Sequence, residues 1–171
     1  MKEGLQASDL VEKAIKYIDK KGDVMDLGCG AGENAVYLAL KGFKVTGIDI
    51  SKQFIHKSKN LAKIYDVDKD IAFLERDIVQ FKYDKSYNLV ISDFVFHFMG
   101  KEEIDIVIKN MKENTTNNGI NAISVLKDDN SNKGFIHLFK LDELKGHYND
   151  WEILEYGEEK GYQFIISRKV R

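Results

Sequence analysis

Two hydrophobic periodicities alternate along the chain. Apolar residues recur at helical spacing in four long segments, residues 8–20, 33–41, 52–65 and 101–114. Between them stand short runs that predict strands, at residues 24–27, 43–48, 71–74, 87–92 and 120–126, and the run at 87–92 is almost wholly apolar, as a strand buried on both faces should be. Strands that alternate with helices predict an α/β fold, a Rossmann-like, mainly parallel sheet with helices on both faces.

The pattern changes near the end of the chain. A short helix is predicted at residues 141–148, followed by two strands at 151–156 and 162–168. Residues 157–161 between these strands are too few for a crossover helix, so the pair predicts an antiparallel hairpin. Asn-Asn-Gly at 117–119 predicts a turn just before the fifth strand.

Composition narrows the class of protein. A chain of 171 residues with 43% hydrophobic residues is expected to form one domain, spanning residues 1–171. The formal net charge of −2 provides no basic field for nucleic acid or an anionic membrane. There is no apolar run of the roughly 18 residues that a membrane span needs, and the first residues do not resemble a signal peptide. A single cysteine, Cys29, favours the reducing cytoplasm. The sequence carries no signal for an oligomeric state.

A glycine-rich turn follows the first predicted strand. Gly28, Gly30 and Gly32 are spaced G-x-G-x-G, whereas the dinucleotide fingerprint is G-x-G-x-x-G. Asp26 stands two residues before the first glycine, and an acidic group there suits a cationic ligand better than a pyrophosphate. Glycines permit close backbone approach, and the N–H groups of such a turn are expected to hold a carboxylate or a hydroxyl.

A second acidic residue completes the pattern. Asp49 ends the second predicted strand, and a carboxylate at that place can accept both hydrogen bonds of a ribose diol. After the third strand, Asp77 can accept from an adenine amino group and Ile78 can pack on the ring. An amino-acid end, a nearby positive charge and a ribose together describe S-adenosylmethionine. The alternative is a glycine-rich turn without a ligand.

These motifs resemble a known family. Residues 24–39 and 45–51 resemble the class I S-adenosylmethionine-dependent methyltransferases, and within them most closely the tellurite-resistance (TehB-type) family. Residues 94–99, 108–113 and 144–156 add to the resemblance. It implies a seven-stranded sheet whose last strand is antiparallel. It also implies that the glycine turn contacts the methionine part of the cofactor, that Asp49 contacts the ribose, and that Asp77 and Ile78 contact the adenine.

Residues expected to bind the cofactor lie on the glycine turn, on the helix that follows it, and at the carboxyl ends of the first four strands. They are Asp26, Gly28, Cys29, Gly30, Gly32, Asn34, Asp49, Ile50, Asp77, Ile78, Ser92, Asp93 and Phe94.

The expected reaction is an in-line displacement at a sulfonium, which requires positioning and exclusion of water. The acceptor is expected to be a small molecule, either a soft chalcogen species or a small metabolite. His97, after the fourth strand, and His137 are the catalytic candidates, each with local packing as the alternative. Lys127 and Phe135 are the candidates for substrate contact. The loop at residues 127–139 is expected to move without ligand and to determine acceptor selectivity.

Other functions remain open or are disfavoured. An O- or N-methyltransferase of a metabolic pathway and a non-catalytic S-adenosylmethionine-binding protein are the alternatives. The glycine spacing disfavours a nicotinamide dehydrogenase. The chain has no proline, so it lacks the Pro-Pro motif of adenine-N6 and glutamine methyltransferases. The four histidines show no metal-ligand spacing, so no metal is expected.

Overall fold

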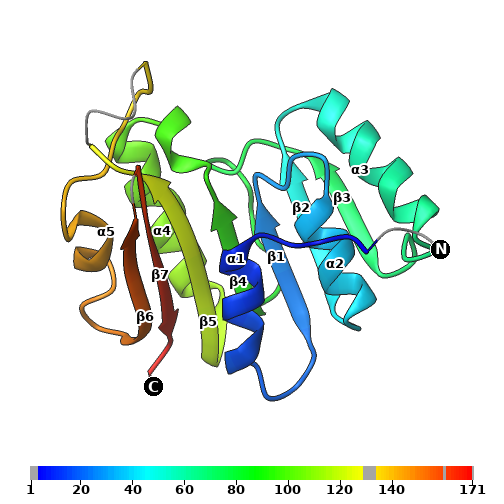
Figure 1. The fold of residues 1–171 in the computed structure, drawn as a ribbon, viewed down its shortest axis with the longest axis horizontal. Coiled ribbons are helices and arrows are strands. Elements are labelled where there is room, and N and C mark those ends of the chain that lie inside the picture. Colours follow the sequence, from blue (N-terminus) through cyan, green and yellow to red (C-terminus); the bar gives the residue numbers. More distant parts are fainter. Residues whose placement is uncertain (1–3, 129–133, 160, 171) are drawn as a thin grey trace.

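The computed structural model describes residues 4–128, 134–159 and 161–170. Seven strands form one sheet in the order β3-β2-β1-β4-β5-β7-β6 (Figure 1). Five neighbouring strands are parallel: β1 (Asp23–Leu27), β2 (Lys44–Asp49), β3 (Ile71–Glu75), β4 (Tyr87–Asp93) and β5 (Thr115–Leu126). β7 (Tyr162–Arg168) is antiparallel to both β5 and β6 (Glu152–Glu159). The predicted fold, a Rossmann-like and mainly parallel sheet with a C-terminal antiparallel hairpin, is confirmed.

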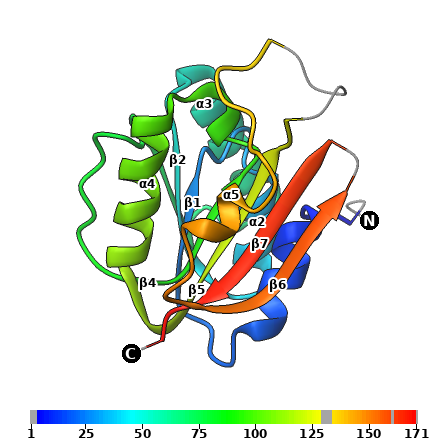
Figure 2. The same cartoon turned by 90° about the vertical axis from the view of Figure 1, so that its left-hand side faces the viewer.

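Helices cover both faces of the sheet, as their apolar spacing predicts (Figure 2). The first face carries α1 (Asp9–Ala14), α2 (Glu33–Leu40) and α3 (Lys52–Ile64), and the second carries α4 (Lys101–Glu113) and the short α5 (Glu143–Gly146). Two 3-10 turns, Ile15–Tyr17 and Phe96–Phe98, complete the helical elements of the described chain. No described helix is long and apolar enough to span a membrane.

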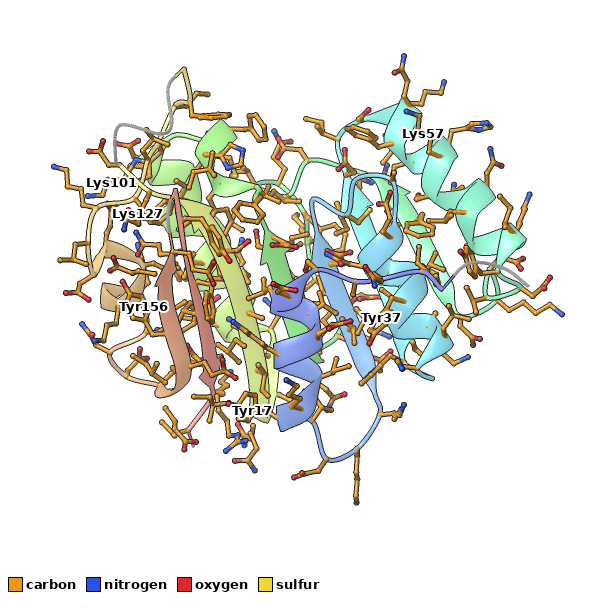
Figure 3. All side chains as sticks on the ribbon, viewed as in Figure 1. Tyr17, Tyr37, Lys57, Lys101, Lys127 and Tyr156 are labelled. Carbon is orange, nitrogen blue, oxygen red and sulfur yellow. The ribbon has the colours of Figure 1, made fainter. Side chains whose placement is uncertain are left out.

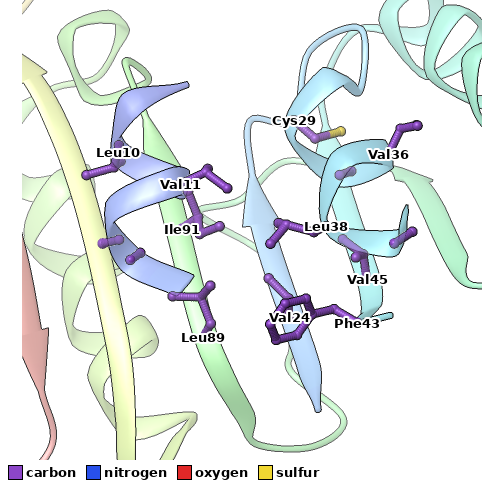
Figure 4. Packing of buried hydrophobic residues seen from close by; sticks show 14 of the residues in the cluster. Leu10, Val11, Val24, Cys29, Val36, Leu38, Phe43, Val45, Leu89 and Ile91 are labelled. Atoms are coloured by element: carbon purple, nitrogen blue, oxygen red, sulfur yellow. The ribbon is translucent and has the colours of Figure 1, made fainter. Parts of the chain in front are cut away.

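On the first face of the sheet, α1 and α2 each bury apolar side chains against the strands. Leu10 and Val11 of α1 lie over β5 and β4, and Leu38 of α2 lies over β1 and β2 (Figure 4). All three side chains are at most 5% exposed, so each contributes roughly 1.5–3 kcal/mol through burial. The amphipathic helices therefore fix the sheet, and with it the positions of the strand ends.

The first helix is shorter than its pattern predicts. The segment 8–20 was expected to be helical throughout, but α1 ends at Ala14 and a 3-10 turn follows. Ser8 caps the start as predicted, since its side chain accepts from the backbone N–H of Val11. Beyond the helix, the Tyr17 hydroxyl donates to Glu155 at 2.8 Å. The residues after Ala14 therefore leave the α-helix although their apolar spacing is helical, and Tyr17 contacts β6 instead.

The turn predicted at residues 117–119 is wrong. These residues lie inside β5, where the pairing with β4 shifts register between Tyr87 and Leu89. Asn118 has a φ of +63°, and its N–H still donates to the carbonyl of Lys169 at 3.2 Å. Asn-Gly therefore forms a bulge within a continuous strand, because a partner segment satisfies its backbone.

The terminal hairpin is confirmed, but it is longer than predicted. Gly157 belongs to β6 and pairs with Phe164, and β6 continues to Glu159, which pairs with Tyr162. A Cβ atom placed on Gly157 would lie 2.2 Å from the Phe164 ring. Glycine is thus required here to leave room for an aromatic side chain, and it does not end the strand.

Candidate functional site

The glycine turn lies at the switch point of the sheet, where β1 is flanked by β2 and β4. The N–H groups of Gly28 and Cys29 donate to the Ile48 carbonyl at 2.7 and 2.9 Å. The Gly32 N–H donates to the Cys29 carbonyl at 3.0 Å. The Gly30 N–H donates to Asp49 Oδ2, also at 3.0 Å. The expectation that the turn offers free N–H groups to a ligand is therefore wrong for these four residues.

The three glycines have different reasons to be glycine, although each has a positive φ. A Cβ atom on Gly28 would lie 2.4 Å from Val95, and one on Gly32 would lie 2.6 Å from Ser58. A Cβ atom on Gly30 would meet nothing within 4 Å. Gly28 and Gly32 allow close packing inside the protein, whereas Gly30 presents bare backbone to open space.

Asp49 joins the turn to the second strand. Its carboxylate is largely buried and accepts from the N–H groups of Gly30 and Ser51, the latter at 2.8 Å. An ionised carboxylate offers roughly four lone-pair sites. The two backbone bonds fix the orientation of Asp49 and leave acceptor capacity on the side that faces the cavity described next.

A cavity of about 480 Å³ opens beside the turn, a volume within the range of small-molecule sites. Its wall combines the glycine turn, the start of α3, the segment after β3 and the segment after β4. The lining residues are Gly28, Gly30, Asp49, Ile50, Ser51, Phe54, Arg76, Asp77, Ile78, Val79, Phe94, Val95, Phe98, Met99 and Glu103.

Much of the predicted cofactor set reaches this cavity. Seven of the predicted residues line it, Gly28, Gly30, Asp49, Ile50, Asp77, Ile78 and Phe94. Several lining residues were not singled out from the sequence, among them Phe54, Arg76, Phe98 and Glu103. The sequence offered a local signal of a site position for two of these residues. Arg76 directly precedes Asp77, and Glu103 stands at the third position of α4, where its side chain accepts from the Gly100 N–H. Phe54 had none.

Asp26 and Cys29 lie behind the cavity and do not line it. Asp26 is 2% exposed, and its Oδ2 atom has no hydrogen-bond partner. Burial, together with the charges of Asp93, Asp49 and Glu33, raises the pKa of Asp26 to about 7. Burial also raises the pKa of the Cys29 thiol, so the thiol stays protonated.

Three more of the predicted cofactor residues lie outside the cavity lining: Asn34 of α2, and Ser92 and Asp93 at the end of β4. The Asn34 side chain donates to Asp93 Oδ2 at 3.2 Å and accepts from the Ser8 N–H at 2.9 Å. The Ser124 hydroxyl donates to the other oxygen of Asp93. Asn34 therefore ties the N-terminal segment to Asp93, while the Ser92 hydroxyl is buried without a partner.

His97 and Phe135 lie in an aromatic cluster beside the cavity. The His97 ring centroid is 4.1 Å from that of Phe98 and 4.6 Å from that of Phe135. His97 is 5% exposed, its Nδ1 atom has no partner, and burial lowers its pKa. Phe98 lines the cavity, whereas His97 and Phe135 support it from behind.

Lys127 and His137 are paired with acidic residues away from the cavity lining. Lys127 lies at the end of β5 (Figure 3), and its Nζ is 3.1 Å from Glu158. His137 Nε2 is 2.8 Å from Glu143. Residues 129–133 of the predicted acceptor loop lie outside the described residues. Within the described chain, no group of three or more His, Cys, Asp or Glu side chains is placed to hold a metal ion.

Comparison with known proteins decides the family. Residues 5–166 match the model of the family "Tellurite resistance protein TehB". This chain belongs to the TehB family. The resemblance to the tellurite-resistance (TehB-type) methyltransferases, read from residues 24–39, 45–51 and the later segments, is confirmed.

Individual relatives agree. The chain is 35% identical over 144 residues to a Haemophilus influenzae protein named probable S-adenosyl-L-methionine-dependent methyltransferase TehB, covering 81% of this chain and 49% of the relative. It is 31% identical to a ubiquinone biosynthesis O-methyltransferase of Rickettsia akari, covering 68% of this chain and 46% of the relative. The chain thus spans about half the length of the curated relatives it matches.

Solved structures show the same fold. The crystal structure of TehB from Haemophilus influenzae superposes with a TM-score of 0.84 at 31% identity, covering 93% of this chain and 61% of that one. The N-methyltransferase NodS from Bradyrhizobium japonicum, in complex with S-adenosylhomocysteine, superposes with a TM-score of 0.79 at 17% identity, covering 95% and 84%. The latter likeness concerns the fold alone.

Proposed function

We propose that this chain binds S-adenosylmethionine in the 480 Å³ cavity and transfers its methyl group to a small acceptor. The observation that carries the proposal is the carboxylate of Asp49, which is held by the Gly30 N–H and lines the same cavity as Asp77 and Ile78. The TehB family membership and the printed name of the Haemophilus influenzae relative support it.

The cofactor would lie across the strand ends with its ribose at Asp49. Ile50 and Ile78 supply apolar surface for the adenine. Asp77 accepts from the Val79 N–H through Oδ1 at 2.9 Å, so its remaining capacity serves the adenine amino group. Gly30 is the point of closest approach because no side chain occupies the space beside it.

Charge around the turn suits a cationic cofactor. Asp26, Asp49 and Asp93 lie close enough for the charges of the other two to raise the pKa of Asp26. A sulfonium relieves this repulsion, whereas a pyrophosphate would increase it. Cys29 takes no part as a nucleophile, because its thiol stays protonated and lies outside the cavity lining.

The chemical step requires little from the protein beyond placement and a dry site. Phe94, Phe98 and Met99 supply the apolar wall that excludes water. His97 and Phe135 act through Phe98 as positioning residues, since their rings pack on it. His137 and Lys127 hold the neighbouring segments through Glu143 and Glu158. The acceptor is a soft chalcogen species or a small metabolite, and the protein works in the cytoplasm.

Calorimetry with three ligands tests the proposal. S-adenosylmethionine and S-adenosylhomocysteine should both bind with a 1:1 stoichiometry, and NAD should not bind. Transfer of label from methyl-labelled S-adenosylmethionine to any small acceptor then tests the activity. Binding of NAD alone would contradict the assignment of the cavity, and cofactor binding without transfer to any acceptor would favour a non-catalytic binding protein.

A further inference from the structure

A second, smaller cavity lies on the other side of Phe94. It has a volume of about 180 Å³ and is formed by α1, the ends of β4 and β5, and β7. Phe94 lines both this cavity and the larger one, so the two cavities adjoin at this residue. α1 lies against the sheet at this place (Figure 1), and its residues Asp9, Leu10 and Lys13 line the second cavity.

The backbone of Phe94 is fixed by two hydrogen bonds at the boundary that the cavities share. Its N–H donates to the carbonyl and to the hydroxyl of Ser124, at 3.1 and 3.0 Å. Its ring packs edge-on against Tyr162, with 5.4 Å between the centroids. Its φ is +56°, a conformation that costs a non-glycine residue energy and that tends to occur at functional sites.

The walls of the second cavity have the chemistry of a cation site. Phe94, Tyr162 and Phe164 provide aromatic surface, and Asp9 and Asp93 provide two carboxylates. The only cationic lining side chain of the described residues is Lys13, whose ammonium lies 4.0 Å above the Phe164 ring. Aromatic faces attract ammonium groups. The surplus of carboxylates favours a cation and disfavours an oxyanion such as selenite or tellurite.

We propose that the second cavity is the acceptor site and that the acceptor is a small primary amine. The inference rests on the proposed function, because the methyl donor must occupy the larger cavity. At about 30 Å³ for a molecule the size of water, 180 Å³ holds roughly six non-hydrogen atoms. The ammonium group lies between Asp9 and Asp93, and its carbon chain contacts the aromatic rings.

The reaction balances without a further reagent. The bound ammonium first releases one proton to water, which leaves a neutral amine with a free electron pair. Its nitrogen attacks the methyl carbon in line, the C–N bond forms as the C–S bond breaks, and sulfur keeps the bonding electrons. The products are the N-methylated secondary ammonium ion of the acceptor and the neutral thioether S-adenosylhomocysteine. The carboxylate of Asp93, fixed by Asn34 and Ser124, stabilises the cationic amine before and after transfer.

Four probes of similar size and different charge test the inference: propylamine, 1-propanethiol, propionate and selenite. Each is offered to the full chain with methyl-labelled S-adenosylmethionine. We expect transfer to propylamine. In Asp9→Asn, the KM for propylamine should rise about fivefold or more, while the dissociation constant of S-adenosylhomocysteine stays unchanged. Asp9 is exposed, so this variant should fold.

Glu12→Gln is the matched control, because Glu12 is an exposed acidic residue of the same helix that does not line the cavity. It should leave both constants unchanged. Two results would overturn the inference: transfer to the thiol or selenite with none to the amine, or weaker S-adenosylhomocysteine binding in Asp9→Asn, which would assign the cavity to the amino-acid end of the cofactor. Absence of cofactor binding to the unaltered chain would instead overturn the proposed function.

Discussion

The two cavities meet at one edge of the sheet, yet they are built by different means. The cofactor side is organised by contacts between the turn after β1 and the end of β2, such as the Gly30 N–H to the Asp49 carboxylate, 19 residues apart. The second cavity depends on longer connections, such as Asn34 to Asp93, 59 residues apart, and on segments from α1 and β7. A local motif therefore specifies the glycine turn and Asp49 of the first cavity, whereas the second cavity depends on how α1 and β7 pack against the sheet.

The largest expected effect concerns the buried charge behind the cofactor side. The pKa of Asp26 is about 7 in the folded protein and near 3.9 in the unfolded chain. The native state therefore binds the extra proton between about pH 4 and pH 7, and the free energy of unfolding falls as pH rises through this window. Asparagine does not titrate, so the free energy of unfolding of Asp26→Asn does not fall in this window. At pH 8 this variant should be more stable than the unaltered chain, by an amount on the order of 4 kcal/mol.

Urea unfolding at pH 4, 6 and 8 measures this difference. The unfolding free energies of Asp26→Asn and the unaltered chain should converge as the pH falls toward 4, where Asp26 is protonated in the folded protein and about half protonated in the unfolded chain. A constant difference between the two free energies of unfolding from pH 4 to pH 8 would show that folding does not raise the pKa of Asp26. The same measurement with bound S-adenosylmethionine should reduce the gap at pH 8, because the sulfonium stabilises the ionised carboxylate.

Asp49→Ala should weaken S-adenosylhomocysteine binding by ten- to a hundredfold. The ribose loses hydrogen bonds to a charged group, which contribute about 1.5–3 kcal/mol each. Calorimetry measures the loss. Asp70→Ala is a control, because Asp70 forms an exposed ion pair with Lys44 outside the cavity lining. Equal dissociation constants for Asp49→Ala and the unaltered chain would remove Asp49 from the ribose site.

Two glycine variants distinguish a glycine that approaches the cofactor from a glycine that only allows close packing inside the protein. Gly30→Ala should reduce cofactor affinity about tenfold with a stability loss of roughly 1–2 kcal/mol, the cost of a left-handed alanine. Gly32→Ala should lose more stability, since its Cβ atom would also lie 2.6 Å from Ser58. Thermal denaturation and calorimetry on both variants check this. Intact cofactor binding in Gly30→Ala would mean that the ligand does not approach the turn closely.

The smallest effect is expected at Lys127. Its ion pair with Glu158 is partly exposed, and such pairs contribute about 0–1 kcal/mol. Lys127→Ala should leave cofactor affinity and the KM of the acceptor unchanged within error. A large rise in KM would restore Lys127 to the acceptor site, and would move that site from α1 toward the end of β5.

The elements that the sequence predicted well are those with strong periodicity and local caps. β4 is apolar almost throughout, and Ser51 caps α3 where expected. The predictions that failed concern residues whose partners are distant. Asn-Gly at 118–119 forms a bulge because Lys169 pairs with it, and Gly157 continues its strand because Phe164 needs the space. Neither partner is visible in the local pattern.

The site residues also differ in whether the local sequence could reveal them. Gly30, Asp49 and Asp77 were predicted from their positions, since each lies at the end of a predicted strand or within three residues after it. Nothing local distinguished Phe54 or Asp9, which reach their cavities only through the packing of α3 and α1. Histidine was favoured for chemistry at 97 and 137, but both rings are occupied by aromatic or acidic neighbours. Residue type alone could not reveal those neighbours.

The most direct test of the account is an NMR titration of the labelled protein with S-adenosylhomocysteine. The largest amide shifts should fall on Gly28–Gly30, Ile50, Ile78 and the segment 94–99, which surround the larger cavity. The hairpin of β6 and β7 should shift little, apart from Tyr162 beside Phe94. Shifts centred on residues 134–143, with none at the glycine turn, would contradict the assignment of the cofactor to this cavity.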